Sequence, residues 1–128
     1  MQYEYFYGAQ AEQFSFYRIP KALFTEPNFR ELSTDAKVLY GILLDRMSLS
    51  LKNQWLDAQN KVYIIFTVEE IMDALNCANQ KAMRLMVELE KQVGFIERKR
   101  QGLGRPNLIY VKNFAATING KSCEKGDS

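Results

Sequence analysis

The sequence contains no histidine, and its two cysteines, Cys77 and Cys123, lie far apart without the spacing of a metal site. A chain without histidine cannot form the Ser-His and Cys-His nucleophile systems or the common histidine-containing zinc sites. The cysteines are typical of free thiols in a reducing compartment. The carboxylates are scattered over predicted helix starts and solvated faces. We therefore expect that the protein is not an enzyme and needs no metal or cofactor.

Long apolar runs are also missing. No stretch approaches the roughly 18 apolar residues that a membrane helix requires, and the N-terminus has no basic-then-apolar leader. With 128 residues, of which 47% are hydrophobic, the chain is large enough for one domain with one core. We expect a cytoplasmic protein that does not enter a membrane.

The net charge is only +2, but it is unevenly distributed along the chain. Residues 1–75 contain 7 basic and 10 acidic residues, whereas residues 76–112 contain 8 basic and 3 acidic residues, a local charge of +5. Such a concentration of positive charge is typical of nucleic-acid-binding proteins. A charge excess of this size also occurs on ordinary solvated surfaces. Whether it indicates nucleic-acid binding therefore depends on which secondary-structure elements carry the basic residues.

Residues 1–13 form an aromatic but otherwise polar N-terminal segment. Because aromatic side chains are costly to leave in water, we expect this segment to pack against something. Our hypothesis is a dimer contact made by Tyr3, Tyr5, Phe6 and Tyr7. The next residues, 14–19, alternate between apolar and polar and end at Pro20, a pattern that predicts a short strand.

The middle of the chain predicts one long helix and one short hairpin. Ser33 is a suitable N-cap for a helix over residues 34–49. Residues 55–57 and 62–66 bracket a polar turn and form a hairpin candidate. The second of these runs is β-branched and aromatic, and we expect it to be core together with Trp55.

Two helices separated by a short turn follow. Thr67 and Glu70 have the spacing of a capping box at the start of the first helix. Asn79 is a candidate N-cap for a second helix over residues 80–93, which Gly94 ends. The turn of three or four residues is typical of a helix-turn-helix. The predicted core face of the second helix consists of Ala82, Leu85, Met86, Leu89 and Val93.

The opposite face of the second helix is polar and basic. Asparagine and glutamine pair with adenine and arginine with guanine in the DNA major groove, and helix-turn-helix proteins make these contacts from the start of the second helix. The alternative is an ordinary solvated helix face. Met83 and Val87 flank this face; we expect partial burial, with thymine-methyl contact as the alternative. The candidate DNA-binding residues here are Asn79, Gln80, Lys81, Arg84 and Lys91.

Behind this helix lies a predicted β-hairpin. Its strands, residues 95–99 and 108–112, flank a tip with Gly102 and Gly104 that turns tightly. Alternate strand residues face opposite sides, so either Arg98 and Arg100 or Lys99 with the tip meets DNA. The alternative is a basic surface hairpin without a ligand. The candidate DNA-binding residues of the hairpin are Arg98, Lys99, Arg100, Arg105 and Asn107.

The predicted element order is helix, strand, helix, helix, strand, wing, strand. This order predicts an α+β fold, a winged helix-turn-helix with a basic β-hairpin wing. We assign residues 14–114 to the winged-helix domain that binds double-stranded DNA, and residues 115–128 to a polar linker or tail.

Several ordered blocks resemble the N-terminal domain of RepA_N-type plasmid replication initiators, which low-GC Gram-positive plasmids, including staphylococcal multiresistance plasmids, carry. The blocks are FYRIPKALF (16–24), LSTDAKVLYGILLDRMSLS (32–50), VYIIFTVEEI (62–71) and GLGRPNLIYVKNF (102–114). The resemblance implies sequence-specific binding to repeated origin sites, the iterons, and self-association as a homodimer or larger assembly. It also implies a separate C-terminal domain, outside these 128 residues, that engages host replication proteins.

Two other functions fit the same domain. A transcriptional regulator would use the same winged helix and could sense a small ligand in an apolar pocket. A winged helix can also act as a protein-interaction module without DNA. Clustered basic residues on both helix and wing argue against the latter, because interface cores are usually depleted of charge.

Overall fold

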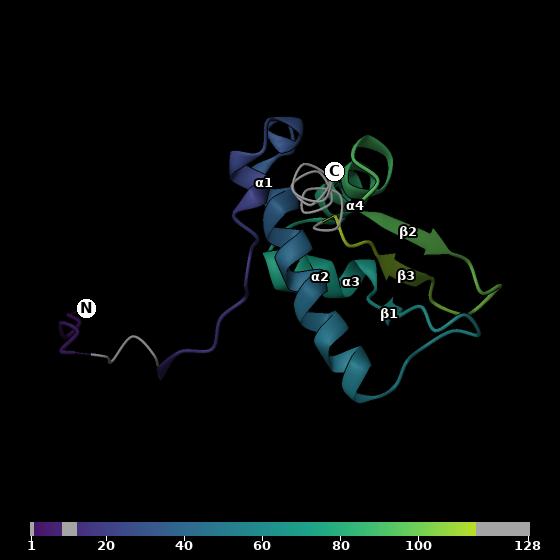
Figure 1. The fold of residues 1–128 in the computed structure, drawn as a ribbon, viewed down its shortest axis with the longest axis horizontal. Coiled ribbons are helices and arrows are strands. Elements are labelled where there is room, and N and C mark those ends of the chain that lie inside the picture. Colours follow the sequence, from purple (N-terminus) through teal and green to yellow (C-terminus); the bar gives the residue numbers. More distant parts are fainter. Residues whose placement is uncertain (1, 9–12, 115–128) are drawn as a thin grey trace, which may run out of the picture.

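Four α-helices and a three-stranded sheet make up the part of the chain that this computed structural model describes, residues 2–8 and 13–114 (Figure 1). No helix in this part is both long and apolar enough to cross a bilayer. In chain order the elements are α1 (Ala22–Thr25), the 3₁₀ turn η2 (Pro27–Phe29), α2 (Thr34–Lys52), β1 (Ile64–Ile65), α3 (Val68–Leu75), α4 (Asn79–Val87), the π-helical turn η3 (Glu88–Gln92), β2 (Ile96–Lys99) and β3 (Leu108–Val111).

Helix α2 begins where its sequence predicts and extends beyond the predicted end at residue 49, to Lys52. The Ser33 hydroxyl accepts a hydrogen bond from the Ala36 backbone N–H at 3.2 Å, which confirms Ser33 as the N-cap. Asp35 in the first turn and Lys52 in the last complement the helix dipole. The helix is therefore stabilised at both ends by local residues.

Residues 14–19, which precede α1, do not form the strand predicted for them. Their backbone is irregular, and at residues 18–19 it crosses α2 at Gly41. A Cβ at position 41 would lie 2.9 Å from Ile19 Cγ1 and 3.0 Å from the Arg18 carbonyl oxygen. The small size of Gly41 thus permits the close approach, and residues 14–18 stay exposed without a pairing strand.

Helices α3 and α4 form the predicted helix-turn-helix. The predicted capping box is present: Thr67 Oγ1 accepts from the Glu70 backbone N–H at 3.1 Å, and Glu70 Oε1 accepts from the Thr67 backbone N–H at 2.9 Å. Asn76 ends α3 in the left-handed region, at φ 52°. The prediction of Asn79 as N-cap of α4 is wrong, because Ala78 holds that position without a side-chain cap.

The predicted single helix over residues 80–93 is divided into α4 and the π-helical turn η3. Leu89 stays fully buried in this turn, and Gly94, at φ 70°, ends it as predicted. π-Helical turns inside α-helices are frequent at functional sites. Here the turn contains Glu88 and Glu90, both of which reach other elements.

The sheet has the order β1-β3-β2 and is antiparallel throughout. Strands β2 and β3 pair with Ile96 opposite Val111 and Lys99 opposite Leu108, so the predicted wing hairpin is present. Strand β1 joins the open edge of β3. The hairpin loop projects beyond the sheet, away from the helices (Figure 1).

The second predicted hairpin, around residues 55–66, is reduced to one bridge between Leu56 and Val62. The prediction that Trp55 is core is also wrong: its side chain is 38% exposed and stacks on Tyr63, with ring centroids 6.3 Å apart. The two-residue strand β1 is too short to cover the indole, whereas Ile64 and Phe66 on the same segment are buried.

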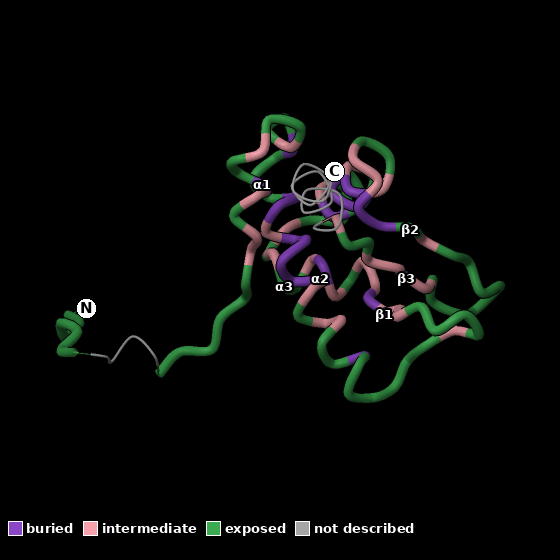
Figure 2. Tube along the Cα trace, viewed as in Figure 1, coloured by how far each residue is buried: buried purple, intermediate pink, exposed green. Residues whose placement is uncertain are grey.

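The core lies between α2, the α3–α4 pair and the inner face of the sheet (Figure 2). Its fully buried members include Leu43 from α2, Ile71 from α3, Leu85 from α4 and Ile109 from β3. At one end, four aromatic rings gather: Phe29, Tyr40, Phe95 and Phe114. Burial raises the pKa of Tyr40 to about 12, and its hydroxyl donates to the Lys112 carbonyl oxygen at 2.8 Å. This core fixes α4 against the sheet that carries the wing.

The aromatic N-terminal segment extends away from this body (Figures 1 and 2). Tyr3, Tyr5, Phe6 and Tyr7 are 61–82% exposed. Phe6 meets Phe14 edge-on at 6.1 Å, but Phe14 is itself exposed. The expected packing is therefore not provided by the core of the same chain, and the dimer contact stays a prediction. The predicted tail, residues 115–128, and Cys123 lie outside the described residues.

Candidate nucleic-acid interface

The recognition helix, α4 together with η3, presents a polar outer face. Ala82, Leu85, Met86 and Leu89 are buried as predicted, and Val93 is half-buried. This packing turns the other side of the helix to solvent. Four of its predicted DNA-binding residues are exposed: Asn79, Gln80, Arg84 and Lys91.

Lys81, at the margin of this face, is held by the body of the domain. Its ammonium nitrogen lies 2.8 Å from Asp35 Oδ2, in the first turn of α2. The side chains of both residues are about half-exposed, so the pair is accessible to water and is screened by salt. The contact holds Lys81 near the N-terminus of α2, whereas Gln80 and Arg84 are exposed to solvent.

Both acidic residues of the recognition helix are turned toward the body. Glu88 accepts from the Ser33 hydroxyl at 2.8 Å and from the Ser33 backbone N–H at 2.5 Å, at the N-terminus of α2. Glu90 accepts two hydrogen bonds from Arg98 on β2. Because these carboxylates are engaged inward, the outer face of α4 and η3 keeps Arg84 and Lys91 without an acidic residue between them.

The Arg98–Glu90 pair joins the wing to the recognition helix. Arg98 Nε and one terminal nitrogen lie 3.0 and 2.6 Å from Glu90 Oε1, and the side chains are only 27% and 17% exposed. The hydrogen bonds from Arg98 hold the pKa of the Glu90 carboxyl below its ordinary value. Of the two arrangements that the sequence left open, this contact favours Lys99 with the tip, because Arg98 is paired with Glu90. Arg100 lies beyond the end of β2 and belongs to the tip.

The wing tip is exposed from Arg100 to Asn107. Gly102 and Gly104 adopt φ of 119° and 78°, which side-chain-bearing residues rarely adopt, and their Cβ positions face open space. The Gln101 amide donates to the Pro106 carbonyl oxygen at 2.8 Å and closes the loop. The loop therefore holds Arg100, Arg105 and Asn107 away from the body, where a phosphate strand can reach them.

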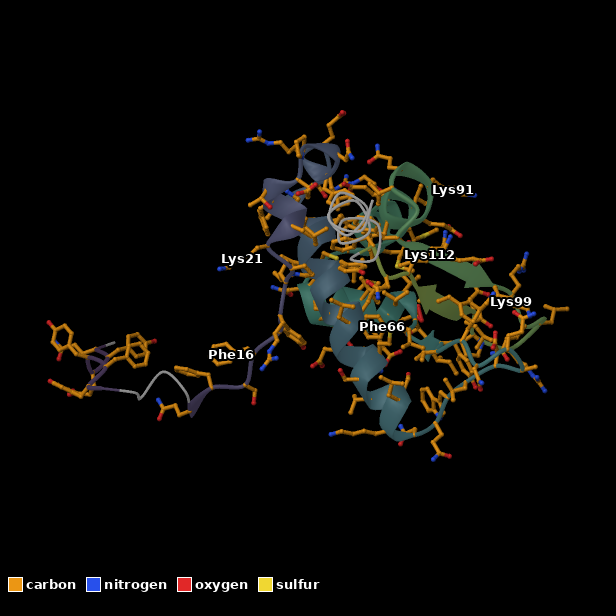
Figure 3. All side chains as sticks on the ribbon, in the orientation of Figure 1. Phe16, Lys21, Phe66, Lys91, Lys99 and Lys112 are labelled. Atoms are coloured by element: carbon orange, nitrogen blue, oxygen red, sulfur yellow. The ribbon has the colours of Figure 1, made fainter. Side chains whose placement is uncertain are left out.

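The ten predicted residues thus form two groups, one on α4 and η3 and one on the wing. In Figure 3, Lys91 and Lys99, one from each group, lie on the same side of the domain, opposite Phe16 and the N-terminal arm. Three apolar side chains near these groups are exposed, which the sequence did not indicate: Met83, Val87 and, at the wing tip, Leu103. Leu103 lies between the two tip glycines, and this position in a predicted turn is the sequence signal that could have indicated its exposure.

A groove of 730 Å³ lies beside the wing, between β2, β3 and the loop over residues 57–61. Its lining includes Asp57, Lys61, Glu97 and Lys99. The backbone N–H of Lys61 holds the pKa of the Asp57 carboxyl below its ordinary value, and the Tyr110 hydroxyl donates to Asp57 at 3.1 Å. The groove therefore has a mixed lining, in which acidic and basic side chains lie beside the apolar side chains of Val62 and Val111.

Comparison with known proteins decides the family. The model of the family described as replication initiator protein A (RepA) N-terminus matches residues 15–125. The chain belongs to this family. A curated relative, a 41 kDa protein of Lactobacillus helveticus, is 29% identical over 103 residues, which are 80% of this chain and 28% of that protein. The chain therefore spans little more than a quarter of the length of this relative.

Solved structures confirm the fold. The N-terminal domain of a DNA-binding protein is 35% identical, with a TM-score of 0.71, over 99% of this chain and 98% of that one. The protein in a structure of a Rep–DNA complex is 34% identical, also at 0.71, over 98% of both chains. An MDR initiator is 37% identical at 0.67, over 93% of this chain and 98% of that one. The predicted winged helix-turn-helix and the predicted family are both confirmed.

Proposed function

We propose that this domain binds repeated duplex DNA sites at a plasmid replication origin and thereby initiates replication of the plasmid. One observation carries the proposal. The carboxylates of α4 and η3 are hydrogen-bonded to the body of the domain, whereas Gln80, Arg84 and Lys91 are exposed on the outer face of the same helix. Membership of the replication initiator family supports it, as does the likeness to the protein in the Rep–DNA complex. The domain acts in the cytoplasm by binding, without a chemical step of its own.

The two groups of residues have different roles in this proposal. Asn79, Gln80 and Arg84 read base edges in the major groove, with Lys81 at the margin of the contact. Lys91 and the wing residues Lys99, Arg100, Arg105 and Asn107 bind the sugar–phosphate strands and set the register of the helix. Arg98 acts mainly through Glu90, by holding the wing against the recognition helix.

Fluorescence anisotropy tests the proposal. The duplexes are the direct repeats from the origin of the plasmid that encodes the protein and a scrambled duplex of equal composition, each at two salt concentrations. We expect tighter binding to the repeats and weaker binding to both at the higher salt, because phosphate contacts release counterions. Equal affinity for both duplexes would contradict repeat recognition. The absence of binding at low salt would favour a protein-interaction module.

The proposal includes self-association. The exposed N-terminal side chains Tyr3, Tyr5, Phe6 and Tyr7 supply the contact between copies, because so much aromatic surface is stabilised by burial. A dimer matches paired or repeated DNA sites, since each copy can occupy one site. The engagement of host replication proteins that the resemblance implies is assigned to a separate C-terminal domain and not to these 128 residues.

A further inference from the structure

Two apolar side chains lie on the exposed side of the recognition helix. Met83 is 51% exposed and Val87 is 45% exposed. The partial burial predicted for them from the sequence is therefore wrong. They are four residues apart, so they occupy neighbouring positions on one side of α4. The fold itself makes little use of either side chain, whereas Ala82, Leu85 and Met86 on the same helix are buried.

The neighbours of Val87 are the residues proposed to meet DNA. Successive helix residues are rotated by about 100°, which places Val87 on the same outward sector as Gln80 and Arg84, with Met83 at its edge. Gln80 and Arg84 are exposed, and the acidic residues that follow Val87 are engaged by Ser33 and Arg98. The apolar pair thus lies inside a basic, hydrogen-bonding surface.

The chemistry of this surface distinguishes between possible occupants. An apolar partner protein would press charged side chains into the centre of the interface, which interfaces generally avoid. The major groove combines hydrogen-bonding base edges with one exposed apolar group, the C5-methyl of thymine. A valine and a methionine beside an arginine and a glutamine match that combination.

We propose that Val87, with Met83 beside it, contacts thymine C5-methyl groups in the major groove and makes thymine part of the sequence that the domain recognises. The inference rests on the proposed DNA-binding function and deepens it. Gln80 and Arg84 read hydrogen-bonding edges, and the apolar pair reads a methyl group that no polar side chain of α4 can select. Thymine at one or two positions of the site is then distinguished from cytosine by its methyl group as well as by its oxygen.

Deoxyuridine tests the inference because it differs from thymidine only by the absence of this methyl group. The tightest duplex is first selected from a random library with the wild-type domain, and each thymine is then replaced in turn. At one or two positions we expect about a fourfold loss of affinity, since removing one buried CH₂-sized group costs about 0.8 kcal/mol. The other thymines should tolerate the replacement.

Variants assign the methyl contact to its residues. Val87→Ala and Met83→Ala should bind the thymine duplex more weakly than wild type, and should lose the preference for thymine over deoxyuridine at the sensitive position. Leu49→Ala is the matched control, because Leu49 is also 45% exposed but lies on α2. It should keep the full preference. Circular dichroism of each variant verifies that the fold is retained.

The possible results distinguish failure of the thymine-methyl contact from failure of the proposed DNA-binding function. Sequence-preferring binding that tolerates deoxyuridine at every thymine would overturn the inference and leave the proposed function intact. The same holds if both Val87→Ala and Met83→Ala keep the thymine preference. Failure to prefer any duplex would instead overturn the proposed function and the inference with it.

Discussion

Arg98 on the wing strand donates two hydrogen bonds to Glu90 at the end of the recognition helix, at 2.6 and 3.0 Å. The pair connects the two elements that carry every proposed DNA contact, and it is mostly shielded from water. Through it, the orientation of the wing depends on the position of η3. Glu88 makes the corresponding connection from η3 to Ser33 at the start of α2.

The Arg98–Glu90 pair predicts an acid-dependent loss of stability. The pKa of Glu90 is lowered in the folded state, so its contribution to the free energy of unfolding is present above the ordinary glutamate value of 4.5 and disappears as the pH falls through the folded value. Glu90→Gln should lower the free energy of unfolding by about 1 kcal/mol near neutral pH, since the pair is partly buried. Urea denaturation at several pH values measures this.

The control for this prediction is Glu97→Gln, which removes an exposed carboxylate next to Arg98 on β2. It should change stability little at any pH. If Glu90→Gln differed from wild type by the same amount at neutral pH and well below pH 4.5, the carboxylate of Glu90 would not be the stabilising group.

Arg84→Ala tests direct base reading. Arg84 is exposed on α4, and a bidentate contact to guanine is lost without it. We expect the discrimination between the selected duplex and a scrambled one to fall by about 1–3 kcal/mol. Anisotropy titrations with both duplexes measure this difference. Equal losses on the two duplexes would assign Arg84 to the phosphate backbone instead.

Lys99→Ala and Arg105→Ala should behave differently from Arg84→Ala. Both residues are exposed on the wing, where we propose phosphate contacts. Each variant should weaken binding to the selected and the scrambled duplex alike. It should also reduce the magnitude of the slope of log affinity against log salt concentration by about 1, as expected for the loss of one phosphate contact. A salt titration of each variant gives the slope. An unchanged slope would show that the wing residue does not reach a phosphate.

Deletion of residues 1–12 tests the N-terminal dimer contact. The deletion removes Tyr3, Tyr5, Phe6 and Tyr7 and leaves the core residues in place. We expect the mass in solution, measured by sedimentation, to fall toward that of the monomer while the thermal unfolding midpoint changes little. A full-size assembly from the shortened chain would place self-association elsewhere on the domain.

Gly41→Ala tests the crossing of residues 18–19 over α2. The new Cβ would lie 3.0 Å from the Arg18 carbonyl oxygen, a backbone atom that cannot rotate away. Overpacking of this kind costs about 1–3 kcal/mol, and the higher helix propensity of alanine offsets about 1 kcal/mol of it. We expect a net loss of stability and faster proteolysis near residues 13–18. The control is Ser48→Ala, at an exposed position of α2. This substitution introduces the higher helix propensity of alanine without a steric clash, so it should not destabilise the protein.

Local signals predicted most of the elements correctly. The Ser33 cap, the Thr67–Glu70 capping box and the Gly94 helix end each depend on residues within a few positions, so the sequence contains the whole interaction. The wing strands and their tip were predicted for the same reason. The local pattern could not distinguish strand 14–19 from an irregular crossing, because alternation predicts a strand only when a pairing partner exists.

Burial and long-range pairing were decided by the tertiary structure. The sequence by itself determined the winged-helix order, the family, and the concentration of basic residues on α4 and the wing. Only the packed chain decided that Arg98 pairs with Glu90, that Lys81 pairs with Asp35, and that Val87 stays exposed. These outcomes depend on which elements meet in space. A residue's periodicity gives the side of its helix, but not whether another element covers that side.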